Sequence, residues 1–439
     1  MKYFIIKFLL KYKYFTPVIL LFLYVCLTLR LYSFILNYTT NFVSWDHLDV
    51  LHAIVSEKDY FKVFLYQQNA HRIGVGLVII KILAILSQWN TRFESLVTVG
   101  LLQCSCLLAF RLKYRLTHSI SVLDAYIGFL FLTLQQSGNL LHGFQLTFVL
   151  PVFLFLIGLN LYTHESTNKR NLLLIGITFL STFSSLQGLY LVLFTGIFFL
   201  YEALHTSHRK QSLMYWVCVL IMLSFIGGYF INYNFSLVKI YTLPPLSFFI
   251  QSIYLQINSV LGWQSMEILS PAVFIISIVY FGYVCFLLSR DIKFSQYYPV
   301  ICLFLYSYMF AIFVVFQRWS SGIEHAYLTR YITHQLPLYF GIYIATWYVQ
   351  KLKLRWTLLI LLLVLYIYNS DFLNAKKPYD YANYIYIGST EWKNCYLETK
   401  DSDYCSNKTN FLIISPDRTD YLKELLKILE DSKLSYFAK

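Results

Sequence analysis

The sequence predicts an all-α polytopic membrane protein with about eleven transmembrane helices, interfacial helices on the outer face and a small extracytoplasmic α/β segment at the C-terminus. Only 13% of the 439 residues are charged, about half the share of a soluble domain, and the mean hydropathy is +0.57. Apolar runs of spanning length recur from end to end. They are too long and continuous for barrel strands, and lipid cannot pair free backbone groups, so the spans are helices.

The basic segments predict the orientation. No small-residue cleavage site follows the Lys-rich N-terminus, so the first span, 17–36, is retained with its start in the cytosol. The net charge of +13 falls mostly in short loops, which is typical of the positive-inside rule and of contact with membrane lipid rather than with nucleic acid. The predicted cytosolic loops are 111–115, 164–170, 205–211, 289–293 and 350–355.

Between neighbouring basic loops there is room for two spans. The predicted hairpins are 119–136 with 145–162, 171–187 with 189–204, 213–232 with 271–289, and 297–316 with 336–349, followed by a last span at 356–369. Three apolar segments, 17–36, 73–88 and 93–110, precede the first basic loop, where topology requires an even number of spans. The middle one is short and contains Lys81, so we predict an interfacial or re-entrant helix on the outer side.

The chain divides into a transmembrane domain, 1–369, and an extracytoplasmic tail, 370–439. The tail mixes strand-like YIYIG (384–388) and FLIIS (411–415) with helix-like YLKELLKILEDSK (421–433). Cys395 and Cys405 flank a polar loop in this tail, whereas the other six cysteines lie in spans. A disulfide between them requires an oxidising compartment, which would place the C-terminus outside the cytosol. Zinc binding is the weaker alternative, because no other ligand cluster lies nearby.

The outer loops carry the polar side chains, and the segment from Ser44 to Arg72 is the richest of them. Asp46 and Asp49 are three residues apart, so at a helix start they would share a face. One of them would serve as a general base, or both would hold a divalent cation such as Mg or Mn. The competing interpretation is that they only cap the following helix.

Cations and amides complete the outer-face set. Arg72, Arg318 and Arg330, with His71 beside the first, suit a donor phosphate because the planar guanidinium makes two charge-assisted hydrogen bonds. Interfacial anchoring is the alternative for these arginines, and hydrogen bonding between helices is the alternative for the amide and histidine groups. The candidates for binding the sugar or the acceptor are Trp45, His47, Asn69, His142, Gln145, Gln187, Glu324, His325 and Tyr331.

Trp45-Asp46-His47-Leu48-Asp49, directly after the first span, resembles the acidic first-loop motif of the GT-C superfamily of integral membrane glycosyltransferases. QNAHRI (68–73), NLLHGFQ (139–145) and EHAYLTRY (324–331) look like recurrent elements of a poorly characterised bacterial group of such proteins. Ala70 stands where that group tends to have Glu, and the first-loop acids are split rather than adjacent. The resemblance implies Asp46 as the catalytic base with Asp49 second, and it implies Arg72 and Arg330 near the donor phosphate.

The sequence therefore predicts a glycosyltransferase of the cytoplasmic membrane, with its N-terminus in the cytosol, that works at the outer face. It would transfer a sugar, with inversion, from a polyprenyl-phosphate donor to a cell-surface glycan or a lipid-linked acceptor. An O-antigen or capsule polymerase shares the lipid-linked donor and is the nearest alternative. A lipid or solute transporter fits less well, because the spans contain few ionisable residues and no repeat is evident. A non-enzymatic assembly protein would leave the polar clustering unexplained.

Overall fold

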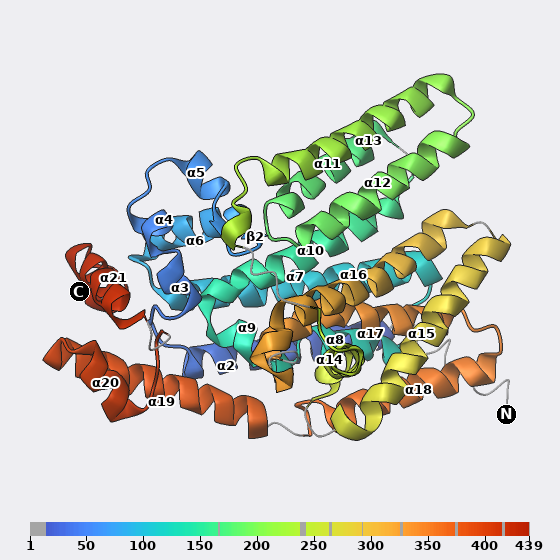
Figure 1. Ribbon diagram of the computed structural model, residues 1–439. Helices are drawn as coiled ribbons and strands as arrows, with labels where there is room; N and C mark the ends of the chain where they lie inside the picture. Colours follow the sequence, from blue (N-terminus) through green and yellow to red (C-terminus); the bar gives the residue numbers. More distant parts are fainter. Residues whose placement is uncertain are drawn as a thin grey trace.

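The computed structural model shows a bundle of helices with one short hairpin (Figure 1). The structure describes residues 15–165, 167–237, 243–262, 266–291, 293–324, 328–373, 376–414 and 418–438. Within these ranges the β-structure consists of β1 (Gln67–Gln68) paired antiparallel with β2 (His71–Arg72). The predicted all-α class is confirmed.

Eight helices in the described residues are long and apolar enough to cross a membrane. They are α2 (Phe15–Tyr38), α7 (Thr91–Thr117), α10 (Leu146–Tyr162), α12 (Gly188–His205), α13 (Arg209–Phe230), α15 (Met266–Asp291), α16 (Phe294–Arg318) and α18 (Leu352–Asn369). Large apolar side chains such as Leu21, Leu220 and Ile275 are exposed on their outward faces. Exposed apolar surface on long helices is what a lipid solvent requires, so this is a multi-pass membrane protein.

Shorter helices lie between these. They are α6 (Gly74–Ser87), α8 (Ala125–Phe131), α9 (Ser137–Leu141), α11 (Asn168–Thr182), α14 (Leu246–Asn258) and α17 (Ile332–Trp347). The prediction of one continuous span at 119–136 was wrong. Ser121 and Asp124 form a reciprocal capping box, and the hydroxyl of Thr133 accepts a hydrogen bond from the Gln135 amide, so side-chain caps restart the helix twice within this segment.

The two ends of the bundle differ in character. At the right of Figure 1 lie three connections: the α12–α13 turn, the α15–α16 turn and the start of α18. These turns carry three of the basic segments expected at the cytosolic face. At the left lie the short helices between α2 and α7. Beside them are α19 (Lys376–Thr399), α20 (Ser402–Thr409) and α21 (Thr419–Asp431). The polar 44–72 segment is therefore at the end opposite to these basic turns.

The 44–72 segment folds into α3 (Asp46–Asp49), α4 (Leu51–Val55), α5 (Tyr60–Phe64) and the β1–β2 hairpin, and it packs on α6. Lys81 of α6 is buried, and its ammonium donates to the carbonyls of Ala53, Ile54 and Glu57 at 3.2, 2.7 and 2.6 Å. A cation among the last carbonyls of a helix satisfies groups that have no partner in the helix itself. Lys81 thus fixes the end of α4, which explains the charge that made this helix unusual.

Replacing Lys81 by methionine is expected to lower the free energy of unfolding by about 3 kcal/mol, because charged hydrogen bonds contribute about 1.5–3 kcal/mol and three carbonyls would lose their donor. Thermal unfolding of the purified protein would measure the effect. Lys62→Met is the matched control, since the Lys62 side chain is 68% exposed. Equal losses of stability in the two variants would contradict the capping role.

The cap, defined as residues 376–438, is helical where it is described, and the predicted α/β tail was wrong. YIYIG lies inside α19, and residues 411–414 form no strand. Pro378, Ala382, Ser389, Trp392 and Tyr396 are buried along one side of α19, with the three-to-four-residue spacing of a helix. The local aromatic and β-branched run favoured a strand, but packing of this longer period decided the structure.

The cap is joined to the 44–72 segment and not merely tethered to the bundle. The amide of Trp45 donates to the carbonyl of Ile413 at 2.8 Å, and the two segments share one apolar core. Cys395 and Cys405 form a disulfide that links α19 to α20. Asp371, just past the expected domain boundary, accepts hydrogen bonds from Arg30 and from the Leu134 amide, so the chain at this boundary is fixed to the bundle.

Candidate functional site

A cavity of about 240 Å³ opens between the 44–72 segment and the helix ends that lie beside it. Its cations are Arg318 and Arg330, and its carboxylate is Asp46. Two guanidinium groups against one carboxylate favour an anionic ligand. The other polar residues that line the cavity are Gln68, Asn69, His71, Thr147, Ser185, Gln187 and Gln317. Phe144 and Phe148 form an apolar wall beside them.

Asp46 and Arg330 face each other across the cavity. Their closest atoms, Oδ2 and Nη1, are 3.6 Å apart, and about a third of the Asp46 side chain is exposed. Arg330 lies in η9 (Thr329–Tyr331), and its carbonyl accepts a hydrogen bond of 2.9 Å from the Asn139 side chain of α9. Its Nε is buried and has no hydrogen-bond partner in the structure. The pair is close but loose, which leaves donor groups of Arg330 available to a ligand.

Arg318 enters the cavity from the last residue of α16. Its Nε donates to the hydroxyl of Tyr331 at 3.2 Å, and Tyr331 is buried. Tyr331 therefore orients Arg318 and does not itself line the cavity, although the sequence predicted a sugar contact. Glu324 is exposed outside the cavity lining, and His325 lies outside the described residues.

His71 comes from the hairpin, whose tight turn places Asn69 at a φ of 51°. Asn residues tolerate this left-handed conformation better than most, and both Asn69 and His71 line the cavity. Burial, together with the charges of Arg318 and Arg330, lowers the pKa of His71 to about 4. The ring is therefore neutral at ordinary pH, and its Nδ1 is buried without a partner.

Arg72, the neighbour of His71, points elsewhere. Its guanidinium donates to the carbonyls of Leu65, Tyr229 and Ile231. These contacts hold the hairpin against the end of α13 and occupy the groups that phosphate would need. The expectation that Arg72 binds donor phosphate therefore has no support in this geometry.

Asp49 faces the cap rather than the cavity. Its Oδ1 is 2.6 Å from the guanidinium of Arg418. Asp46 and Asp49 are the first and last residues of the one-turn helix α3, as expected for a helix start, but their carboxylates pair with different arginines, Arg330 and Arg418. Carboxylates that are each paired with an arginine are poor cation ligands, and no cluster of three or more His, Cys, Asp or Glu suited to a metal occurs in the described part of the chain.

Three further candidates lie near the cavity without lining it. Trp45 is about half exposed at the surface beside Asp46. His142 is hydrogen-bonded to the hydroxyl of Tyr381 at 3.2 Å, and burial lowers its pKa to about 4, with His47 and Arg330 adding to the effect. Gln145 is buried with Oε1 unpartnered. By contrast, Asn69 and Gln187 line the cavity as candidate sugar-binding residues.

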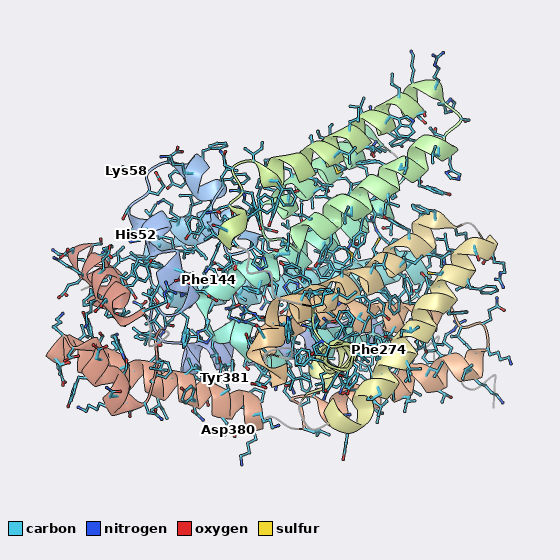
Figure 2. The ribbon with its side chains drawn as sticks, in the orientation of Figure 1. His52, Lys58, Phe144, Phe274, Asp380 and Tyr381 are labelled. Carbon is cyan, nitrogen blue, oxygen red and sulfur yellow. A yellow bond between two sulfur atoms is a disulfide. The ribbon has the colours of Figure 1, made fainter. Side chains whose placement is uncertain are left out.

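Sequence reasoning gave no site role to Ser185, Gln317 and Phe144. Ser185 and Gln317 line the cavity from the segment before α12 and from the end of α16, and the Ser185 hydroxyl is unpartnered. Phe144 lies inside the molecule, whereas His52 and Lys58 lie at its edge (Figure 2). A polar residue that interrupts a long apolar run, as Gln317 does before Arg318, is the signal that would have identified this end of α16.

No family model, curated protein or solved structure matches this chain.

Proposed function

We propose that this protein is a GT-C-type glycosyltransferase that takes a sugar from a polyprenyl-phosphate donor and passes it to a cell-surface glycan or lipid-linked acceptor at the outer face of the cytoplasmic membrane. One observation carries the proposal. Asp46, Arg318 and Arg330 line one cavity at the end of the bundle opposite to the basic turns, with amide side chains around them. A base, two phosphate-binding cations and sugar-binding amides are what this transfer needs.

In the proposed reaction Asp46 accepts the proton of the acceptor hydroxyl. The hydroxyl oxygen forms a bond to the anomeric carbon while the bond from that carbon to the phosphate oxygen breaks, and the electron pair leaves with the polyprenyl phosphate. Arg318 and Arg330 stabilise the growing charge on the phosphate. Attack from the side opposite to the leaving group inverts the anomeric configuration. Gln68, Asn69 and Gln187 bind sugar hydroxyls, and neutral His71 orients the phosphate or the sugar.

We also propose that the chain crosses the membrane eleven times. Residues at the starts of α7, α10 and α12 lie beside or in the cavity: Glu94 contacts His47, while Phe144 and Gln187 line the cavity. Between these starts the chain must return, first through the α8–α9 segment and then through α11. α17 begins at Arg330 and must likewise cross before α18 runs back to the cap. These three shorter crossings, added to the eight long helices, complete the count.

With eleven crossings and a cytosolic N-terminus, the cap lies outside the cytosol. The disulfide between Cys395 and Cys405 supports this orientation, because such bonds persist in oxidising compartments. The short helix α6, about 21 Å long at 1.5 Å per residue, is then interfacial or re-entrant at the outer face. The arginines take the role of neutralising the phosphate, so the proposed reaction routes no step through a divalent cation.

The direct test uses purified protein in lipid nanodiscs with undecaprenyl-phosphate sugars and a panel of envelope glycans as acceptors. We expect binding of the phosphorylated lipid and not of undecaprenol, because the two arginines recognise the phosphate. Transfer of single residues supports the glycosyltransferase, and a ladder of products supports the polymerase alternative. Equal binding of undecaprenyl phosphate and undecaprenol would overturn the proposal.

A further inference from the structure

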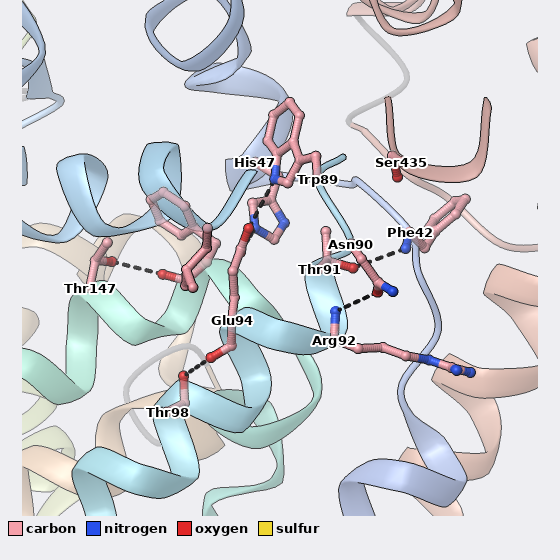
Figure 3. A network of polar contacts seen from close by, with 12 residues as sticks. Phe42, His47, Trp89, Asn90, Thr91, Arg92, Glu94, Thr98, Thr147 and Ser435 are labelled. Carbon is pink, nitrogen blue, oxygen red and sulfur yellow. Dashed lines mark hydrogen bonds and ion pairs between the residues drawn. The ribbon is translucent and has the colours of Figure 1, made fainter. Parts of the chain in front are cut away.

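His47 follows Asp46 directly, yet its side chain is buried away from the cavity lining. Its Nε2 is 2.6 Å from Oε2 of Glu94, and the two side chains are only 3% and 1% exposed. The other carboxylate oxygen of Glu94 accepts a hydrogen bond of 2.9 Å from the Trp89 indole. Figure 3 shows His47 of the 44–72 segment meeting Glu94 of α7 and Trp89, which lies just before α7. Sequence reasoning assigned His47 to sugar or acceptor binding and did not consider Glu94.

The short helix that carries Asp46 has few interactions of its own that would fix its conformation. α3 is a single turn, and no side chain caps its start. Trp45, just before it, has a φ of 51° and a ψ of −121°, a conformation that residues with a side chain rarely adopt. Such a turn persists only where its surroundings fix it. The buried His47–Glu94 pair is a polar side-chain contact that ties this turn to the membrane-spanning helix α7.

The space around Glu94 fits this role closely. A Cβ atom added at Gly143 would lie 2.5 Å from Oε2 of Glu94 and 2.8 Å from the carbonyl of Thr91, so only glycine leaves room for the carboxylate. The next residue, Phe144, contacts the His47 ring edge-on with centroids 5.7 Å apart, and Phe144 also lines the cavity. The pair is therefore connected to the cavity both through the chain to Asp46 and through Phe144.

We propose that His47 and Glu94 form a positioning latch that holds the carboxylate of Asp46 at the cavity. Glu94 acts on the reaction through His47 and touches neither donor nor acceptor. The catalytic effect expected of this latch rests on the proposed function. Its structural consequence, a fixed turn at residues 44–50, is independent of what the protein transfers.

The first experiment compares Glu94→Gln with Asp124→Asn in the full-length protein. Asp124 is the matched control, because it too is a buried carboxylate with a close side-chain partner, here Lys113 at 2.8 Å, and it lies outside the cavity. Hydrogen exchange of peptides covering residues 44–50 is the direct readout of the latch. We expect faster exchange there in Glu94→Gln and wild-type protection in Asp124→Asn. Unchanged protection in Glu94→Gln would overturn the latch.

The second readout is transfer. We expect Glu94→Gln to lower kcat by about tenfold to a hundredfold, because misplacing a reacting group by about 1 Å has an effect of that order, while the donor Kd stays at the wild-type value. Asp124→Asn should keep kcat per folded molecule. An equal fall of kcat in both variants would mean a merely structural role. A wild-type protein that shows the predicted exchange pattern but transfers no sugar would refute the proposed function and leave the latch standing.

Two further variants guard against a failure of Glu94→Gln to fold. Gly143→Ala keeps both members of the pair but pushes on the carboxylate of Glu94, and it should reproduce the faster exchange at residues 44–50. The double variant His47→Gln/Glu94→Gln, in which two amides hydrogen-bond to each other, should recover part of the lost kcat. Wild-type exchange in Gly143→Ala would also count against the latch.

Discussion

Replacing Asp46 by asparagine is expected to lower the turnover number for sugar transfer by about 10²–10⁴-fold, the contribution typical of a general base. Donor binding should not weaken, because the substitution removes a negative charge that would face the donor phosphate beside Arg330. Single-turnover transfer and donor Kd, measured on the same preparation, separate the two effects. Near-wild-type turnover in Asp46→Asn would remove the proposed base.

Asp49→Asn is the matched control for this experiment. Asp49 is three residues away, carries the same charge and pairs with Arg418 of the cap at 2.6 Å. A partly exposed ion pair contributes only about 0–1 kcal/mol, so the variant should fold and keep a turnover close to that of the wild type. A large loss in Asp49→Asn with little effect in Asp46→Asn would reverse the assignment of the two acids.

Replacing Arg330 by glutamine is the variant with the second largest expected effect. We expect kcat to fall by about 10²–10³-fold, since removing one preorganised donor to a developing anion has effects of that size. Donor affinity should also fall. Arg330→Lys should lie between, because lysine keeps the charge but lacks the planar pair of donors.

The control for Arg330 is Arg92→Gln. Arg92 lies near the start of α7, and its Nε donates to the Thr39 carbonyl at 2.9 Å outside the cavity. Its loss should leave both kcat and donor affinity unchanged. If Arg330→Gln bound and transferred as well as Arg92→Gln did, the donor phosphate would have to sit elsewhere.

Much of the fold follows from hydropathy, because lipid imposes the same requirement on every span. The predicted spans 17–36 and 145–162 match α2 and α10 to within two residues at each end, and 93–110 lies inside α7, which continues to Thr117. Prediction failed where local chemistry competes with packing. Thr133 restarts a helix inside an apolar run through a cap that composition does not reveal. The local composition of YIYIG predicts a strand, but the segment lies in α19. The buried positions of this helix follow a helical spacing that extends well beyond these five residues.

The sequence predicted which types of residue the candidate site contains, but not which residues each of them contacts. Sequence alone does not distinguish Arg72 from Arg318 and Arg330. The guanidinium of Arg72 is hydrogen-bonded to backbone carbonyls at the end of α13, and only the path of that helix reveals this. The assignment of Asp46 over Asp49 depends on which arginine each meets, and Arg418 is 369 residues from Asp49. Glu94, by contrast, left a signal. An acid in the first turn of an apolar span needs a buried partner, and His47 was available.

The contact between Trp45 and Ile413 sets an order of events during synthesis. Ribosomes add about 5–20 residues per second, so roughly 20 to 70 seconds separate the appearance of these two residues. The turn that carries Asp46 cannot reach its final form until the segment around Ile413 has been made and has packed against it. If the proposed function holds, a nascent chain that has not yet reached Ile413 would be inert towards a lipid-linked substrate already present in the bilayer.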